Sequence, residues 1–222
     1  MSNNINATTV VNPKVDVIQF ANGNECVVVD GQKELVYERV RESSLMIHDG
    51  GVLYIAKLLE DRCDFWTNDV LVYCGVEYFG AEHIERVIGF INGEPVFYGF
   101  TCEDGYHYSV DVGKTENCLT FESISETSIR IEHDMPVYAA CAYERWYAVI
   151  GNRTFGPYTE EPAIVVSSDK ADTFQINGTF EGTSYYRSVT VEELLKLEPS
   201  RHAGVHAKHA RGEIATPSTH AL

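Results

Sequence analysis

The residues best suited to acid–base or metal chemistry are two His-Asp dipeptides, His48-Asp49 and His133-Asp134. Each precedes a polar turn between two apolar runs, so both pairs are expected at the same place in two repeats and on one face of the fold. An imidazole beside a carboxylate can bind a metal ion or exchange a proton. However, Asp in a hairpin turn commonly bonds its own backbone and leaves a neighbouring His exposed. We therefore keep the metal site as a hypothesis beside that plainer interpretation.

Other catalytic signals are missing from the sequence. The motifs G-x-S-x-G, H-E-x-x-H, G-x-x-x-x-G-K and G-x-G-x-x-G do not occur. The six cysteines at positions 26, 63, 74, 102, 118 and 141 form no C-x-x-C pair and lie in apolar stretches. We interpret them as reduced core residues rather than a disulfide framework. The sequence thus favours a protein that is not an enzyme, and we expect no cofactor.

Aromatic residues indicate an alternative to catalysis, namely a binding surface. Alternation along a strand predicts that one member of each adjacent pair faces the core and the other faces solvent. Exposed tyrosines beside Asp and Asn suit stacking by a carbohydrate or a peptide, although packing between sheets explains these residues more readily, because β-sheets favour aromatic residues in any case. The candidates are Tyr106, Tyr108, Trp146, Tyr147, Tyr158, Tyr185 and Tyr186.

These residues sit on a repeating framework. Four apolar and aromatic runs each close on a glycine, at residues 26–31, 71–75, 109–113 and 146–151, and the glycines lie 44, 38 and 38 residues apart. Spacing near 40 residues is typical of a four-stranded unit used several times. We expect each glycine-closed run to be the third strand of its unit.

A second recurring device is a polar turn between apolar strands, at residues 46–54, 90–98, 131–138 and 166–174. The first two contain Asp-Gly and Asn-Gly, the strongest short hairpin signals, because both central residues of a type I′ turn need positive φ. Each unit is therefore predicted to be a four-stranded antiparallel meander, and the fold class is all-β.

One segment carries a family resemblance. Residues 145–158 form an aromatic-led strand ending in glycine and then a Gly-Pro-aromatic turn, and residues 163–169 form a strand ending in Ser-x-Asp. This copy resembles the repeat of TolB-type, WD-repeat-like β-propellers, while the other copies share only the period. The resemblance implies a propeller and a binding surface. Counting the hairpins along the repeat gives about five units, with the first and last incomplete, so we expect a small propeller of about five blades. The ring would close if residues 15–20 completed a sheet begun by residues 183–189. An open twisted stack of β-meanders is the alternative.

Helical signal is confined to the C-terminal part. Thr190 and Glu193 form a T-x-x-E capping box ahead of a leucine-rich stretch, which predicts one short helix. After it the composition turns to Ala, Gly, His and Thr. We predict a single β-repeat domain over residues 1–198 and a flexible, histidine-containing tail over residues 199–222.

The net negative charge of the chain disfavours anionic partners. Seventeen Lys and Arg face 33 Asp and Glu, for a formal charge of −16, which repels nucleic acid and anionic membranes. The N-terminal residues lack the charge and apolar run of a secretory signal, so we expect a cytoplasmic protein without nucleic-acid or membrane partners. The leading prediction is a non-catalytic protein-binding or assembly module, with a protein partner or a second copy. The alternatives are a carbohydrate-binding lectin, for which a glycan is the ligand, and a hydrolase-type enzyme with a loop-built site.

Overall fold

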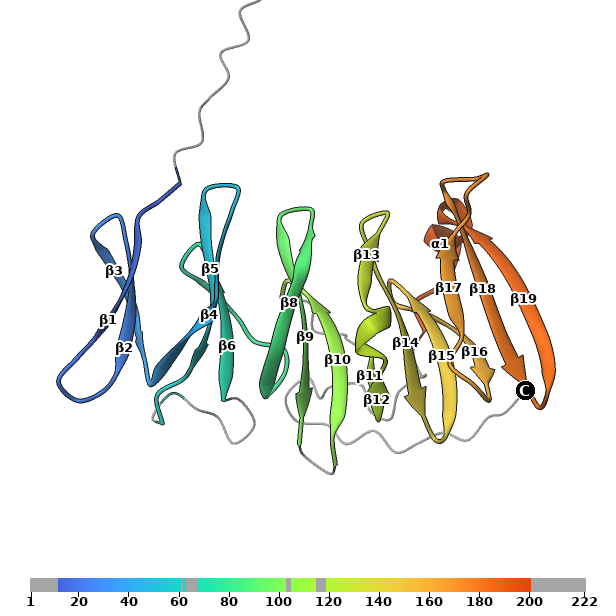
Figure 1. The fold of residues 1–222 in the computed structure, drawn as a ribbon, viewed down its shortest axis with the longest axis horizontal. Helices are drawn as coiled ribbons and strands as arrows, with labels where there is room; N and C mark the ends of the chain where they lie inside the picture. The colour runs from blue at the N-terminus through green and yellow to red at the C-terminus, as the bar shows by residue number, and fades with distance from the viewer. Residues whose placement is uncertain (1–11, 61, 63–67, 103–104, 115–118, 201–222) are drawn as a thin grey trace, which may run out of the picture. The chain divides into compact units, whose positions relative to one another are not determined.

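The structure is a computed structural model that describes residues 12–60, 62, 68–102, 105–114 and 119–200. These residues form five antiparallel sheets with one short 3-10 helix and one short α-helix, which confirms the all-β prediction (Figure 1). Within this part of the chain no helix has the length and apolar character needed to cross a membrane. Contacts divide the chain into two units at Arg86 and Val87, and each unit is described by itself.

Unit 1 contains two meanders that share a core. The first has strands β1 (Val15–Gln19), β2 (Glu25–Val29) and β3 (Gln32–Tyr37). The second has β4 (Arg39–His48), β5 (Gly51–Lys57), β6 (Asp69–Tyr73) and β7 (Val76–Tyr78), in that order. Apolar side chains from both sheets form one buried cluster, which includes Val27, Tyr37, Val52, Tyr54 and Val70.

Unit 2 holds the remaining sheets. Strand β8 (His83–Ile91) starts before the division and is followed by β9 (Glu94–Thr101), β10 (His107–Val112) and β11 (Thr120–Phe121). The next sheet contains β12 (Ser123–Ile124), the 3-10 helix Glu126–Ser128, β13 (Arg130–Glu132), β14 (Met135–Ala142), β15 (Arg145–Ile150) and β16 (Arg153–Tyr158). The last contains β17 (Ala163–Val166), β18 (Thr173–Phe180) and β19 (Thr183–Thr190). One buried cluster lies between each pair of consecutive sheets.

The hairpin turns follow the predicted chemistry. Asp49 and Gly50 have φ of 48° and 77°, and Asn92 and Gly93 have φ of 51° and 80°, as type I′ turns require. The glycine-closed runs are β6, β10 and β15, each third in its sheet, so that prediction is confirmed for three of the four runs. The first run is β2, the middle strand of a three-stranded sheet.

The two His-Asp pairs are not structurally equivalent, so that part of the prediction was wrong. His48 ends β4 and pairs with Gly51, while Asp49 opens the turn. His133 and Asp134 are themselves the two turn residues, with φ of 52° and 55°. The reason is that the second turn has no glycine, so the histidine and the aspartate must occupy both left-handed positions. Relative to the turn, His133-Asp134 lies one position further along the chain than His48-Asp49.

Each chain end pairs with its neighbour within its own unit. Strand β1 pairs with β2 over five residue pairs, from Val15 opposite Val29 to Gln19 opposite Glu25, and β19 pairs with β18. The predicted pairing of the two chain ends concerns strands of different units and stays a prediction.

The predicted helix is confirmed as α1 (Val191–Lys196) with a complete capping box. The Thr190 hydroxyl accepts from the backbone N–H of Glu193 at 3.1 Å, and the Glu193 carboxylate accepts from the Thr190 N–H at 2.8 Å. Residue Ser200 still donates its N–H to the Asn152 carbonyl at 3.0 Å. The rest of the predicted tail, residues 201–222, lies outside the described residues.

The prediction that the cysteines are core residues was wrong for Cys74 and Cys102. Cys26 is buried as expected, but Cys74 and Cys102 are exposed and Cys141 is half-buried, and none of these four described cysteines forms a disulfide. Cys74 lies outside the core because it occupies a turn position with φ of 51°. The cysteines at positions 63 and 118 are outside the described residues.

Candidate functional site

A tyrosine-lined hollow of about 420 Å³ lies on unit 2. Its walls come from β16 and from the hairpin of β18 and β19, which the lower right of Figure 1 shows side by side. The hollow brings together three of the seven tyrosine and tryptophan residues singled out in the sequence. Its lining residues are Gly156, Pro157, Tyr158, Phe180, Tyr185, Tyr186 and Arg187. We refer to it below as the tyrosine hollow.

Two glycines allow the ring of Tyr158 to take its place. Opposite Trp146 and Ala148, the register of β16 shifts between Tyr158 and Phe155, so Gly156 and Pro157 form a bulge. A Cβ at Gly156 would lie 2.9 Å from the Trp146 carbonyl oxygen. On β18, a Cβ at Gly178 would collide with the Tyr158 ring. Hence the ring fits against β18 only because Gly178 has no side chain.

The tyrosines differ in exposure. Tyr158 is 6% exposed and forms part of the core, whereas Tyr185 is 50% and Tyr186 62% exposed. The expectation that one of two adjacent tyrosines faces the core therefore fails for β19. The reason is that β19 is an edge strand of the last sheet, and residues 183–188 are all exposed.

Two arginines flank these rings. The Arg187 guanidinium carbon lies 4.7 Å from the centroid of the Phe155 ring, and that of Arg145 lies 5.3 Å from the Phe180 ring. Neither arginine forms an ion pair with a described residue. Stacking leaves the guanidinium N–H groups at the ring edge available to a ligand. The hollow therefore combines flat apolar contact with positive charge.

The pKa values of two tyrosines in this region, Tyr158 and Tyr147, lie above the ordinary value for a phenol. Burial raises the pKa of Tyr158, and the positive charge of Arg187 opposes that rise. Burial also raises the pKa of Tyr147, with a further contribution from Cys141. Both phenols stay protonated at neutral pH and can donate hydrogen bonds.

Trp146 and Tyr147 stand behind the hollow. Both are half-buried, and they pack against different cores: Trp146 against the cluster shared with the last sheet, and Tyr147 against the cluster shared with the preceding one. This is the alternation expected of a strand covered on both faces. Their side chains support the site rather than line it.

Tyr106 and Tyr108 belong to another aromatic group of unit 2. The Phe100 ring lies 5.4 Å from Tyr106 and 5.5 Å from Tyr108, and Tyr108 stacks on Tyr98 at 6.0 Å. Tyr106 is 61% exposed and Tyr108 is half-buried. Neither lines the tyrosine hollow.

The residues of the metal hypothesis lie in different units. His48 Nε2 is 3.5 Å from Asp49 Oδ2, and its ring lies 6.4 Å from the Tyr73 ring. The His133 ring stands edge-on to Phe174 at 5.5 Å, beside the exposed Asp134. The structure thus describes each pair separately, and a metal site at these residues stays a prediction.

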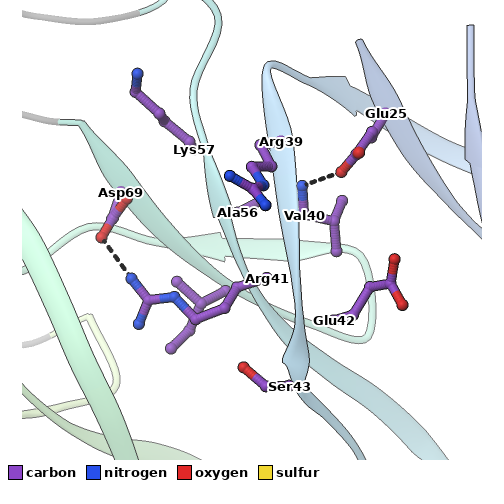
Figure 2. Close-up of a pocket in the computed structure, with 10 residues that line it drawn as sticks. Glu25, Arg39, Val40, Arg41, Glu42, Ser43, Ala56, Lys57 and Asp69 are labelled. Carbon is purple, nitrogen blue, oxygen red and sulfur yellow. Dashed lines mark hydrogen bonds and ion pairs between the residues drawn. The ribbon is translucent and has the colours of Figure 1, made fainter. Parts of the chain in front are cut away.

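Unit 1 has a charged hollow of about 550 Å³ (Figure 2). Arg41 Nη2 lies 3.3 Å from Asp69 Oδ2, and the Glu25 carboxylate accepts the backbone N–H of Val40 at 2.7 Å. The sequence does not indicate this site, because its residues come from four strands and match no motif. Its lining residues are Glu25, Arg39, Val40, Arg41, Glu42, Ser43, Ile55, Ala56, Lys57 and Asp69.

Two buried tyrosines form a separate network in unit 1. The Tyr37 hydroxyl donates to Glu77 at 2.9 Å and the Tyr54 hydroxyl to Glu34 at 2.5 Å. Burial is the largest cause that raises the pKa of both phenols, followed by these carboxylates. Arg62 donates to both oxygens of Glu77, at 2.7 and 2.8 Å. The network ties strands β3, β5 and β7 together and keeps its phenols neutral.

Comparison with known proteins adds no relative. No protein-family model, curated protein or solved structure matches this chain. The geometry of the two hollows and of the strands around them is therefore the basis for inferring function.

Proposed function

We propose that this protein is a non-catalytic binding module that takes an extended peptide segment of a partner protein along strand β19. The observation that carries the proposal is the tyrosine hollow beside an exposed strand edge. In β-strand addition, main-chain hydrogen bonds supply affinity and pockets for alternate side chains supply specificity.

The edge of β19 suits such an addition. The strand is eight residues long, and among the described strands it pairs with β18 alone. Proteins usually protect long edges with proline, lysine, bulges or a covering loop. Strand β19 contains no proline or lysine, and its only charged residue is Arg187. A free edge of this length supports a role in pairing.

The tyrosine hollow would select the side chains of the peptide. Tyr185 and Tyr186 offer exposed flat apolar surfaces, and such rings give contact area at a low cost in side-chain entropy. Arg187 and Arg145 offer guanidinium donors that fit a carboxylate. We therefore infer that the bound segment presents an apolar or aromatic side chain next to a carboxylate.

The repeat architecture belongs to the same proposal. Five sheets agree in number with the five units expected from the sequence period, which supports a scaffold made of repeats. A propeller of the TolB type stays a proposal from the sequence resemblance. An open stack of meanders stays the alternative to it.

A peptide-display selection tests the proposal. Random linear peptides are selected on the full chain, and the affinity of a selected peptide is measured by fluorescence anisotropy. We expect Arg187→Gln to weaken binding about tenfold or more, because a charge-assisted hydrogen bond contributes about 1.5–3 kcal/mol. Tyr185→Ser should weaken it as well.

The matched control is Tyr106→Ser, which removes an equally exposed tyrosine of the same unit outside the hollow. This variant should bind the selected peptide as the wild type does. Equal binding by all the variants would contradict the proposal. A second contradicting outcome is that no peptide is selected while glycans on an array bind the protein in a way that depends on Tyr185. That result would favour the lectin.

A further inference from the structure

Strands β4 and β5 carry three cations on one face of their sheet. Arg39 and Lys57 are directly opposite each other in the register, and Arg41 lies two residues further along β4. Like charges directly opposite each other destabilise a sheet. Such a pair is unexpected in a chain with only 17 basic residues against 33 acidic ones. This like-charge pair therefore needs negatively charged groups to compensate it.

Contacts within the protein compensate the positive charges of two of these three side chains, Lys57 and Arg41. Lys57 Nζ lies 2.8 Å from Glu38 Oε1. Arg41 is held by Asp69 at 3.3 Å and donates to the Ile84 carbonyl at 2.6 Å. The Arg39 side chain forms no hydrogen bond or ion pair with any residue in the described part of the chain. Its guanidinium keeps its full set of donors for a ligand.

The carboxylates of the hollow are arranged around Arg39 without binding it. Glu25 is engaged by the Val40 N–H, and Asp69 accepts both Arg41 and the Ile84 N–H, at 3.1 Å. Figure 2 shows the Arg39 side chain between Lys57 and Glu25, with Arg41 below it. Positive charge is thus left uncompensated inside the hollow.

We propose that this charged hollow binds a small molecule that bears a phosphate group. Arg39 would donate two parallel N–H groups to the phosphate oxygens, and Lys57 would add a second positive charge from the facing strand. The hydroxyl of Ser43, which lines the same hollow, adds a donor. A volume of about 550 Å³ is sufficient for a ligand of this kind. The site is independent of the peptide proposal.

The surrounding charges restrict the ligand to a compact anion. Glu25, Glu38 and Glu42 flank the three cations, and the chain as a whole carries a formal charge of −16. An extended polyanion such as nucleic acid would meet this repulsion along its length. One phosphate group seated between Arg39 and Lys57 would meet much less of it.

Thermal unfolding and calorimetric titration with inorganic phosphate test the proposal. Chloride at the same ionic strength serves as the reference, so that general screening is removed. Because a ligand that binds only the folded protein stabilises it, phosphate should raise the Tm in a saturable way beyond chloride. Arg39→Gln should lower the phosphate affinity about tenfold or more, and Lys57→Gln should lower it as well.

The matched control is Lys196→Gln, which removes one positive charge from α1 in the other unit and should leave phosphate binding unchanged. Without phosphate, Arg39→Gln should be at least as stable as the wild type, since it removes the like-charge pair. If Arg39→Gln does not fold, Lys57→Gln decides the test. A phosphate effect no larger than that of chloride, or an undiminished one in both variants, would overturn the proposal.

Discussion

Gly178 determines whether the tyrosine hollow can form. Its missing side chain makes room for the ring of Tyr158, and the position has no left-handed φ that would itself forbid alanine. Gly178→Ala should therefore act through the collision alone. We expect a loss of about 1–3 kcal/mol in the free energy of unfolding, as for other overpacked positions, and weaker peptide binding.

Urea denaturation measures this loss, with Asn177→Ala as the control on the exposed neighbouring position. The control should stay within about 0.5 kcal/mol of the wild type, as surface substitutions usually do. Wild-type stability and wild-type peptide affinity in Gly178→Ala would show that the Tyr158 ring is not held as described.

Ser44 and Ser128 perform the same bridging role in two repeats. Each hydroxyl donates to a carbonyl three residues earlier at 2.6 Å and accepts a strand N–H at 2.8 Å, that of Ile55 on β5 or of Ala139 on β14. The Ala139 N–H is fully buried. Ser128→Ala should cost about 1–3 kcal/mol, because that donor loses its partner.

The measurement is again the free energy of unfolding, now with the exposed Ser168→Ala as the reference variant. Ser128→Thr keeps the hydroxyl and should recover part of the loss. If the alanine variants at positions 128 and 168 were equally stable, the bridging role of the hydroxyl would be refuted.

At the scale of elements, the capping box of α1 gives a pH-dependent contribution. Hydrogen bonds from the Thr190 backbone N–H and hydroxyl hold the pKa of Glu193 below its usual value of 4.5. Since the folded pKa is lower than the unfolded one, the stabilisation is complete above the unfolded pKa and is lost as pH falls through the folded pKa.

The difference in urea midpoint between the wild type and Glu193→Ala should therefore be full near neutral pH and shrink as the pH falls below 4.5. Glu198→Ala, an exposed carboxylate after the helix, is the comparison and should show no such change. A difference that persists undiminished into strong acid would mean that the carboxylate does not cap the helix.

The sequence predicted elements where the signal is local. Asp49-Gly50 and Asn92-Gly93 specify their turns because few dipeptides accept two left-handed residues. The Thr190 capping box likewise depends on neighbours three residues apart. The repeated serine bridge was not predicted, although similar tetrapeptides carry it, Glu-Ser-Ser-Leu at 42–45 and Glu-Thr-Ser-Ile at 126–129, because its role depends on the partner strand.

The candidate site was predicted only in part. Tyr158, Tyr185 and Tyr186 were singled out as aromatic residues, yet their convergence depends on the bulge at Gly156 and on the space at Gly178. The charged hollow was missed because periodicity does not specify which strands meet, and its like-charge pair exists only in the register of β4 and β5.

At the scale of the whole molecule, net charge and local charge act in opposite directions. A formal charge of −16 disfavours anionic partners at long range, whereas Arg145 and Arg187 at one hollow and Arg39 at the other attract a carboxylate or a phosphate at short range. The molecule is thus expected to accept small or singly charged anionic groups at defined positions.

Hydrogen exchange at β19 tests the central claim, strand addition by a partner peptide, most directly. Alternate backbone N–H groups of a strand point to opposite edges, so a paired peptide should slow the exchange of every second amide among residues 183–188. The other amides, already bonded to β18, should change little. Unchanged exchange across these residues with the selected peptide bound at saturation would contradict the account.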